Sequence, residues 1–284
     1  MTRVLNVRNG CLLAALLAAA SLGGCGSIGF VTSEPDPNVT ATTTNITSLS
    51  EVVQRNPNDP QAYNVRGAVL GRAGRNEEAL ADFNKALSIN PGFAQAYANR
   101  GLIYRQMRKY DLAVADYNKA LEIDGSYSPA YLGRGMVHRQ QGQAMAALTD
   151  FNKAMELKPD NAPAYYNRGL LYQAQRQHNY AIDDFTTAIN LAPQQADARV
   201  ARAQSYLATN DQQAAANDLD EAVQIEPESL QAWTTRGLAY ERLGDKEKAA
   251  GSYAKAMIIK RDYEPARKGF ARVGGKPGQS YATF

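Results

Sequence analysis

The sequence has few of the residues that most often carry metal, redox or nucleophilic chemistry. Its 284 residues include two cysteines, two histidines and one tryptophan. The histidines, His138 and His178, belong to no His-Glu-x-x-His zinc motif and have no recognisable catalytic partners in the sequence. We therefore expect no catalytic residues, no metal and no cofactor, and interpret the chain as a protein that is not an enzyme.

An excess of charge of one sign is missing as well. The chain carries 31 Lys and Arg against 28 Asp and Glu, a net charge of +3. If residues 1–24 are removed, as argued below, Arg3 and Arg8 go with them, and 31 − 2 = 29 basic residues remain against 28 acidic ones, a net +1. Nucleic-acid-binding domains have a strongly basic surface. We therefore expect no binding of nucleic acid.

Long apolar runs are scarce, and the longest lies at the N-terminus. Residues 11–20 are entirely apolar and follow the two arginines, which is the pattern of a signal peptide too short to span a bilayer. The next residues, Leu22-Gly-Gly-Cys25, resemble the bacterial lipobox. The resemblance implies a lipoprotein signal peptide at 1–24, cleavage before Cys25 and acylation of its thiol with palmitate. Simple secretion, with a cysteine nearby by chance, is the alternative.

The same resemblance implies a location. Gly26 follows the cysteine where an inner-membrane lipoprotein of enterobacteria would carry Asp. The expected location is therefore the bacterial cell envelope, anchored by lipid in the outer membrane and facing the periplasm. Because Cys25 would be the one cysteine left, no disulfide within the chain is expected.

Two short segments lead from this cysteine to the body of the chain. Residues 25–47 are rich in Thr, Ser, Asn and Pro without helical or strand periodicity, which predicts a flexible tether. Ser48-Leu-Ser-Glu51 has the spacing of a capping box, which predicts a short N-terminal cap helix within 48–58.

The body repeats itself six times with a period of 34 residues. One set of repeating positions is mostly aromatic: Tyr63, Tyr97, Tyr131, Tyr165, Arg199 and Trp233. A second set is small: Gly67, Gly101, Gly135, Gly169, Ala203 and Gly237. A third set is large and apolar: Phe83, Tyr117, Phe151, Phe185, Leu219 and Tyr253. Two further sets are alanine: Ala79, Ala113, Ala147, Ala181, Ala215 and Ala249, and Ala86, Ala120, Ala154, Ala188, Ala222 and Ala256.

The pattern of these sets resembles the tetratricopeptide repeat (TPR) over residues 60–262. Apolar residues at positions 4, 8 and 11 of each repeat, and at 20, 24 and 27, mark one face of each of two helices. The resemblance implies an all-α, right-handed TPR solenoid of six helix-turn-helix repeats. A C-terminal cap helix is predicted at 263–273 and a flexible tail at 274–284.

Position 7 of every repeat is arginine, although most TPR sequences have leucine there, and position 23 is aspartate in five repeats. A hairpin that turns at position 15 brings positions 7 and 23 to the same height. We interpret the pairs as a ladder of structural ion pairs: Arg66 with Asp82, Arg100 with Asp116, Arg134 with Asp150, Arg168 with Asp184, and Arg202 with Asp218. A row of arginines that binds anionic ligands is the alternative.

The TPR resemblance also implies that the first helices line a concave groove. The candidate residues for binding an extended segment of a partner protein there are Asn64, Asn99, Arg105, Arg139, Tyr166, Asn167 and Gln173. Asn99 and Asn167 occupy a position at which some TPR families hold a peptide backbone with asparagine amides. The lysines of a chaperone-tail receptor are missing from the matching positions of the six repeats. Surface positions that only water contacts are the alternative.

Together these features favour an envelope-anchored adaptor or scaffold, similar in architecture to bacterial TPR lipoproteins of the NlpI type. Its expected partners are envelope proteins, for example peptidoglycan enzymes or proteases, and a homo-oligomer is compatible with the sequence. The alternative is an assembly factor of the pilotin or Tad-pilus type, for a pilus or a secretion machine.

Overall fold

The computed structural model describes residues 37–281, with side chains from residue 45 onward. The described residues form fourteen α-helices and no strand, which confirms the all-helical class. The predicted signal peptide, the predicted lipid site Cys25 and residues 26–36 of the predicted tether lie outside the described residues.

Helix α1 spans Pro37–Arg55, and six helix pairs follow it. We call the first helix of each pair the A helix: α2 (Pro60–Arg72), α4 (Ala94–Gln106), α6 (Ser128–Gln140), α8 (Ala162–Ala174), α10 (Ala196–Ala208) and α12 (Leu230–Leu243). The second, or B, helices are α3 (Asn76–Ile89), α5 (Tyr110–Ile123), α7 (Ala144–Leu157), α9 (His178–Leu191), α11 (Gln212–Ile225) and α13 (Lys246–Ile259). Helix α14 (Glu264–Arg272) closes the array.

The tight turn inside each pair requires a left-handed residue at position 15. Three repeats place glycine there, and Gly74, Gly142 and Gly244 have φ values of 75°, 73° and 84°. The other three adopt the same conformation with Arg108, Arg176 and Asn210, at φ 58°, 60° and 60°. Glycine reaches this region without strain, whereas other residues do so at a cost. The identical turn in all six repeats shows that helix packing decides the backbone there.

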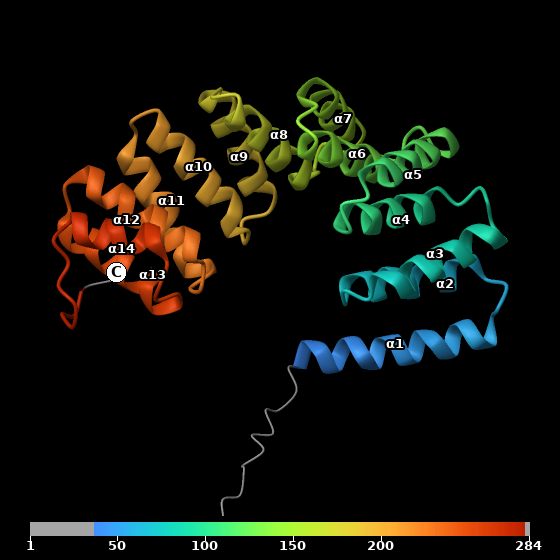
Figure 1. Ribbon diagram of the computed structural model, residues 1–284. Helices are drawn as coiled ribbons and strands as arrows, with labels where there is room; N and C mark the ends of the chain where they lie inside the picture. Colours follow the sequence, from blue (N-terminus) through green and yellow to red (C-terminus); the bar gives the residue numbers. More distant parts are fainter. Residues whose placement is uncertain (1–36, 282–284) are drawn as a thin grey trace, which may run out of the picture.

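The pairs stack into a solenoid that follows an open arc from α1 to α14 (Figure 1). Each A helix packs on the B helix of its own repeat, and each B helix packs on the next A helix. Consecutive A helices also contact each other, whereas consecutive B helices do not contact each other anywhere in the described chain. The A helices therefore line the inner, concave side of the arc and the B helices its outer side.

Inside each pair a large side chain meets a small one. The position-24 side chains Phe151 and Phe185 are fully buried, and their rings lie against Gly135 and Gly169 of the paired A helix. A Cβ at Gly169 would stand 2.7 Å from Cε1 of Phe185, closer than two carbon atoms approach in proteins. Glycine at position 8 thus lets the two helix axes approach each other, and the ring fills the space between them.

Helix α1 differs from the sequence-based expectation. It begins at Pro37 rather than Ser48, so the part of the predicted tether from Pro37 to residue 47 is helical. Ser48 and Glu51 lie inside the helix and form no capping box, because there is no helix start to cap. The helix ends at Arg55, inside the range 48–58 given for the cap helix. Among the described residues no helix is both long and apolar enough to cross a membrane.

Tertiary contacts explain why the helix is longer than predicted. Helix α1 occupies the place of a B helix before the first repeat and packs on α2. Ile46 packs against the cluster around Leu70, Val53 is buried, and Ser50 Oγ accepts a hydrogen bond of 3.3 Å from Arg66 Nη1. Proline is favoured in the first turn of a helix, which suits the start at Pro37. These contacts with α2 cannot be predicted from the Thr-rich composition of the segment.

The C-terminal end also differs in part. Helix α14 lies within the predicted range, but the residues after it do not simply extend away. Residues 274–281 turn back on the helix, and the ring of Tyr281 meets that of Phe270 edge to face at 5.7 Å. Gly275 packs against the same Phe270 ring, so a side chain there would collide with it.

Candidate functional site

The arginine–aspartate pairs predicted from the sequence are present in the first five repeats. In each pair the arginine donates from both Nε and Nη2 to the two carboxylate oxygens, at 2.6–3.0 Å. The aspartate side chains are 4–8% exposed and the arginine side chains 17–23%. Such a two-point contact is the strongest geometry for this pair.

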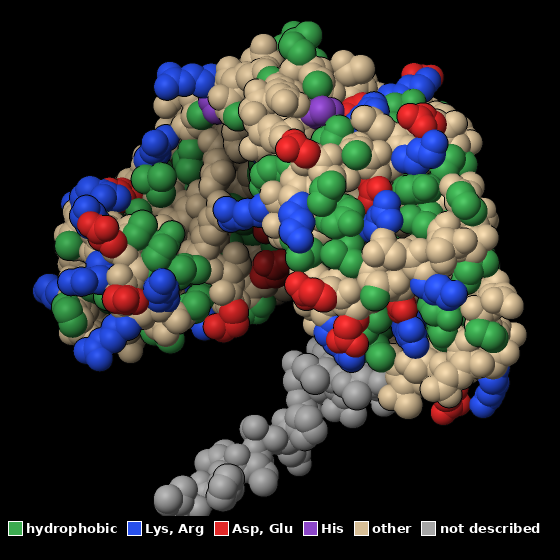
Figure 2. Space-filling view, turned by 45° about the vertical axis from the view of Figure 1, so that its right-hand side comes forward, with side chains coloured by type: hydrophobic (Ala, Val, Ile, Leu, Met, Phe, Trp, Pro, Cys, Tyr) green, Lys and Arg blue, Asp and Glu red, His purple; other side chains and the backbone are tan. Residues whose placement is uncertain are grey.

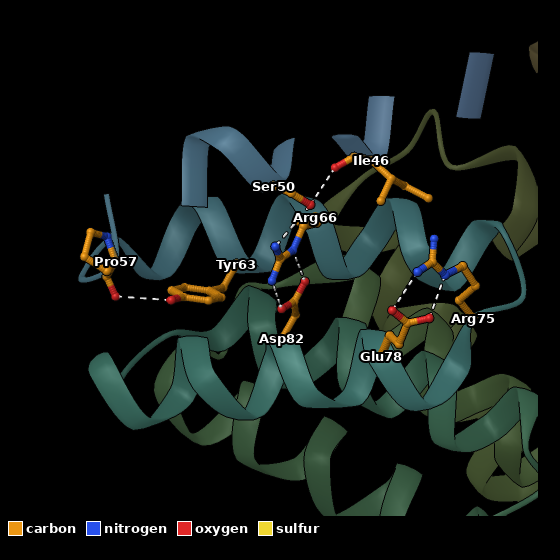
Figure 3. A network of polar contacts seen from close by, with 8 residues as sticks. All are labelled: Ile46, Ser50, Pro57, Tyr63, Arg66, Arg75, Glu78 and Asp82. Atoms are coloured by element: carbon orange, nitrogen blue, oxygen red, sulfur yellow. Dashed lines mark hydrogen bonds and ion pairs between the residues drawn. The ribbon is translucent and has the colours of Figure 1, made fainter. Parts of the chain in front are cut away.

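Each arginine also reaches back to the preceding repeat, so the pairs join into a continuous ladder. In the first repeat, Nη1 of Arg66 donates to Ser50 of α1 while its other nitrogens bind Asp82 (Figure 3). In the following repeats the equivalent Nη1 atoms donate to position 25 of the previous B helix, at 2.6–2.8 Å: Asn84, Asn118, Asn152 and Thr186. One side chain thus connects three helices from two neighbouring repeats.

In the sixth repeat, which lacks the position-23 aspartate, the arginine binds different residues. Arg236 is 2% exposed, donates to Ser252 at 2.8 Å and binds Asp220 of the preceding B helix at 2.6 Å. The second carboxylate oxygen of Asp220 accepts from the hydroxyl of Tyr240 at 2.7 Å. The missing position-23 aspartate is therefore replaced by an acid from the neighbouring repeat.

The charge and the hydrogen-bond donors of the ladder arginines are paired with groups of the same chain. The hydrogen bonds that Arg100, Arg134 and Arg168 donate to Asp116, Asp150 and Asp184 raise the pKa of these arginines, although burial acts in the opposite direction. Aromatic rings of the same A helix lie beside these guanidinium groups, and the centroid of the Tyr131 ring, for example, is 5.5 Å from Cζ of Arg134. These contacts support the structural reading of the ladder rather than a row of arginines open to ligands.

The inner face formed by the A helices is the second candidate site. Figure 2 shows the molecule hollowed between its two arms, with both basic and acidic side chains at the border of the hollow. Along this face, position 9 is apolar in successive repeats, with Leu102 37% exposed and Met136 and Leu170 half-buried. The face thus combines a partly exposed apolar row with charged and polar side chains beside it.

Four of the seven predicted groove residues, the three asparagines and Gln173, use their side-chain amides in internal hydrogen bonds. Asn64 is 2% exposed and accepts from Asn99 of the next A helix at 2.9 Å. Asn167 is 4% exposed, accepts from Arg139 at 3.2 Å and donates to the Pro163 carbonyl at 2.8 Å. Gln173 donates to the carbonyl of Ala201 and to Ser205 Oγ in α10.

These bonds change the interpretation of the asparagines. A partner backbone needs an accessible donor and acceptor on the amide, whereas Asn167 is buried and already uses its oxygen on Arg139 and its NH2 group on Pro163. Asn99 uses its amide hydrogen on Asn64 and is half-buried. The asparagines thus connect neighbouring A helices, which a sequence pattern does not distinguish from binding an extended peptide.

Arg105, Arg139 and Tyr166 remain as groups that a partner could contact. All three are half-buried on the inner face. The ring of Tyr166 lies 5.9 Å from that of Phe185, and burial, reinforced by the charge of Asp197, raises the pKa of its hydroxyl. Neither arginine has an acidic partner in the described part of the chain.

One cavity on the inner face was missed by the sequence analysis. It lies between α12 and α14 and has a volume of about 390 Å³. Its lining residues are Thr234, Thr235, Leu238, Tyr253, Glu264, Pro265, Lys268 and Arg272. Continuing the 34-residue register into the cap helix would have indicated it, because Lys268 and Arg272 then fall on groove positions.

The charged groups at this cavity hold α14 in place. Arg272 binds Glu241 of α12 with two nitrogens, and the Tyr253 hydroxyl donates to the same carboxylate at 2.8 Å. The hydrogen bond from Arg272 holds the pKa of Glu241 below its ordinary value. Glu241 is therefore a carboxylate at neutral pH, and its pairing with Arg272 fastens the last A helix to the cap helix.

The two histidines lie in different helices, α6 and α9. His138 is half-buried, with Nδ1 next to Gln143 and Nε2 3.8 Å from Asp150. His178 begins α9 and is half-buried. No group of three or more His, Cys, Asp or Glu side chains that could hold a metal occurs among the described residues.

Comparison with known proteins identifies the repeat. Family models described as tetratricopeptide repeat match residues 94–127, 162–195 and 200–265, and a model described as TPR repeat matches 72–107 and 135–176. Together these matches span most of the body of the chain. No curated protein sequence matches it.

Solved structures share the fold. In the APC/C hetero-tetramer Cut9–Hcn1, one chain aligns with a TM-score of 0.72 at 18% identity, over 82% of this chain and 46% of that one, so this chain spans about half its length. Pseudomonas aeruginosa PilF aligns with a TM-score of 0.68 at 20% identity, over 75% of this chain and 97% of PilF. A TPR protein from Parabacteroides merdae aligns with a TM-score of 0.59 at 20% identity, over 83% and 93%. Identities this low show the fold alone.

The fold and the family matches agree with the repeat pattern found in the sequence. The tetratricopeptide repeat is a protein–protein interaction scaffold, and proteins built from it are generally not enzymes. The consecutive helix pairs, their turns and the large-against-small packing all have the geometry of this repeat. The chain belongs to the tetratricopeptide-repeat proteins.

Proposed function

We propose that the protein is an adaptor of the bacterial cell envelope that binds extended segments of partner proteins along the inner face of its solenoid. One observation carries this proposal. The polar groups of the ladder are satisfied internally, whereas the inner face keeps an apolar row next to two half-buried arginines without acidic partners. An apolar surface with a few placed polar groups is the usual character of a binding site.

A lipid anchor at Cys25 would hold this adaptor in the outer membrane, facing the periplasm. The proposal rests on the lipobox resemblance of Leu22-Gly-Gly-Cys25. Because α1 begins at Pro37, residues 26–36 alone would separate the acylated cysteine from the first helix. An extended chain spans at most about 3.5 Å per residue, so the start of α1 would stay within about 40 Å of the membrane surface.

The anchor is tested by changing the proposed lipid site. Cys25→Ser is expected to abolish incorporation of labelled palmitate and to move the protein from the detergent phase to the aqueous phase, because the thiol that accepts the lipid is gone. Cys11→Ser is the matched control and should retain the label, since that residue lies in the predicted signal peptide. Absence of label in the wild-type protein would contradict the lipoprotein proposal.

The groove is tested by crosslinking in cells. A photoreactive amino acid at Leu102, on the inner face, is expected to capture specific envelope proteins that mass spectrometry then identifies. The same residue at Glu122, exposed on the outer helix α5, is the control and should capture none of them. Equal capture at the two positions, or capture only at Glu122, would show that partners bind elsewhere.

The second candidate is an assembly factor for a pilus or a secretion machine. It would use the same inner face, with a subunit of the machine as the bound partner. The proteins captured at Leu102 decide between the two candidates: machine subunits favour assembly, whereas peptidoglycan enzymes or proteases favour the adaptor.

A further inference from the structure

Hydrogen bonds connect neighbouring A helices along the inner face. Asn99 of α4 donates to Asn64 of α2, and Arg139 of α6 donates to Asn167 of α8. Further along, Gln173 connects α8 to α10, Arg242 of α12 donates to the carbonyl of Leu207 in α10, and Glu241 binds Arg272 of α14. Most of these bridges start from position 12 or 13 of one helix.

The junction between α4 and α6 is the exception in the described chain. Arg105 stands at position 12 of α4, as Arg139 does in α6, but the residue opposite it is Gly133 instead of an asparagine. The ring of Tyr117 fills the place of the missing side chain, since a Cβ at Gly133 would stand 2.4 Å from it. The guanidinium of Arg105 lies against the Tyr117 hydroxyl, and its Nε is buried without a hydrogen-bond acceptor.

Arg105 and Arg139 also differ from the other arginines that are buried or half-buried in the described residues. Every other one binds a carboxylate: Arg66, Arg100, Arg134, Arg168, Arg199, Arg202 and Arg236. The Nε of Arg139, like that of Arg105, is buried without an acceptor. Burying a cation without a counter-charge is unfavourable.

The two unpaired arginines influence each other. Burial lowers the pKa of Arg139, and the positive charge of Arg105 lowers it further, although Tyr166 acts in the opposite direction. Two like charges at the same position of adjacent helices, both partly desolvated, raise the free energy of the unbound protein. A carboxylate placed between them would relieve both the missing counter-charge and the repulsion.

We propose that Arg105 and Arg139 together bind the side-chain carboxylate of an acidic residue in an extended partner segment. This inference rests on the proposed binding along the inner face and adds the chemical class of the segment. A carboxylate offers acceptors in the plane of a guanidinium, which matches the free donors of two arginines on adjacent helices. The bound group would supply the polar bridge that the α4–α6 junction lacks.

The apolar row next to the arginines defines the rest of the segment. Leu102 and Met136 occupy position 9 of the same two helices, one turn before the arginines. Adjacent helices lie about 8–10 Å apart, and an extended chain rises about 3.3 Å per residue. About three residues of a bound segment therefore span the distance from one A helix to the next. The preferred segment therefore carries apolar residues about three apart and an acidic residue between them.

The test uses four synthetic peptides of nine residues, each with leucine at every third position and serine as filler. Glu, Gln or Lys stands at the central variable position of three of them, with both ends blocked. The fourth has Gln at that position and a free C-terminal carboxylate. It shows whether the site binds a side-chain carboxylate or the C-terminus of a chain. Affinity is measured by fluorescence anisotropy with an uncharged dye, at low and at physiological salt.

Wild-type protein is expected to bind the Glu peptide at least 10-fold more tightly than the other three. Arg105→Gln and Arg139→Gln should each lower that affinity roughly 10- to 100-fold, as expected for loss of one charged hydrogen bond. Arg261→Gln and Arg267→Gln, exposed arginines with no ion pair, are matched controls and should change it less than 2-fold. Circular dichroism checks that each variant is folded, and Arg139→Lys, which keeps the charge, should retain part of the binding.

The outcomes separate this inference from the proposed function. Equal affinity for the Glu and Gln peptides, or preference for the free terminal carboxylate, would overturn the acidic side-chain site. Binding that survives Arg105→Gln combined with Arg139→Gln, or failure of every peptide to bind, would overturn it as well. In each case capture of envelope proteins at Leu102 would still support binding along the inner face, whereas its absence would remove the proposed function itself.

Discussion

Arg134→Leu is expected to lower the free energy of unfolding by about 3 kcal/mol, although leucine is the usual TPR residue at that position. The substitution leaves the carboxylate of Asp150 buried, with its side chain 4% exposed, and without its two charged donors. It also removes the hydrogen bond to Asn118 in the preceding repeat. Removing one partner of a buried ion pair costs about 3–5 kcal/mol, and the 22% exposure of Arg134 places this case at the low end. Urea unfolding followed by circular dichroism measures the loss.

A double-mutant cycle separates the ion pair from simple packing. Asp150→Leu in the Arg134→Leu background removes the unpaired charge, and we expect it to restore part of the lost stability. Arg267→Leu, which changes an exposed arginine without an ion pair, should alter stability by less than about 0.5 kcal/mol. Strictly additive effects of the two ladder substitutions would show that the two side chains do not stabilise each other.

Gly169→Val is expected to be as damaging as the loss of a ladder pair, by about 3 kcal/mol. The first atom of the new side chain would overlap the fully buried ring of Phe185, which stands 2.7 Å from the position of a Cβ. Overpacking a dense core costs about 1–3 kcal/mol, and here neither the helix backbone nor the enclosed ring can move aside without opening the pair. Thermal unfolding of the variant, with the wild-type chain alongside, measures the effect.

The fifth repeat suggests the matching rescue experiment. There Ala203 replaces the position-8 glycine, and Leu219 replaces the aromatic ring, with both side chains fully buried. Gly169→Ala and Phe185→Leu together should therefore cost less than the sum of the two single changes, because the smaller leucine leaves room for the added methyl group. An additive result would mean that the two positions are packed independently, against the geometry of the pair.

Much of the architecture follows from the sequence by itself. A period of 34 residues, with small and large side chains alternating between two helices, specifies the hairpin, and the hairpin specifies which residues meet. The positions of Arg134 and Asp150 on the two sides of a turn were enough to predict their contact. Local periodicity determines such contacts because the partners lie within one repeat, and neighbouring repeats use the same geometry.

Only the tertiary structure determined the contacts between neighbouring repeats and the structure of the segments outside the repeats. Helix α1 extends back to Pro37 because it packs on α2, whereas its Thr-rich sequence has no helical pattern. Asn167 was predicted to bind a partner, and instead it accepts from Arg139 of the preceding A helix. The unpaired state of Arg105 depends on the glycine opposite it and on a tyrosine from a third helix. Such contacts join residues that no single repeat contains, so the repeat pattern specified the hairpins, and only the stacked solenoid decided which polar groups remain free for a partner.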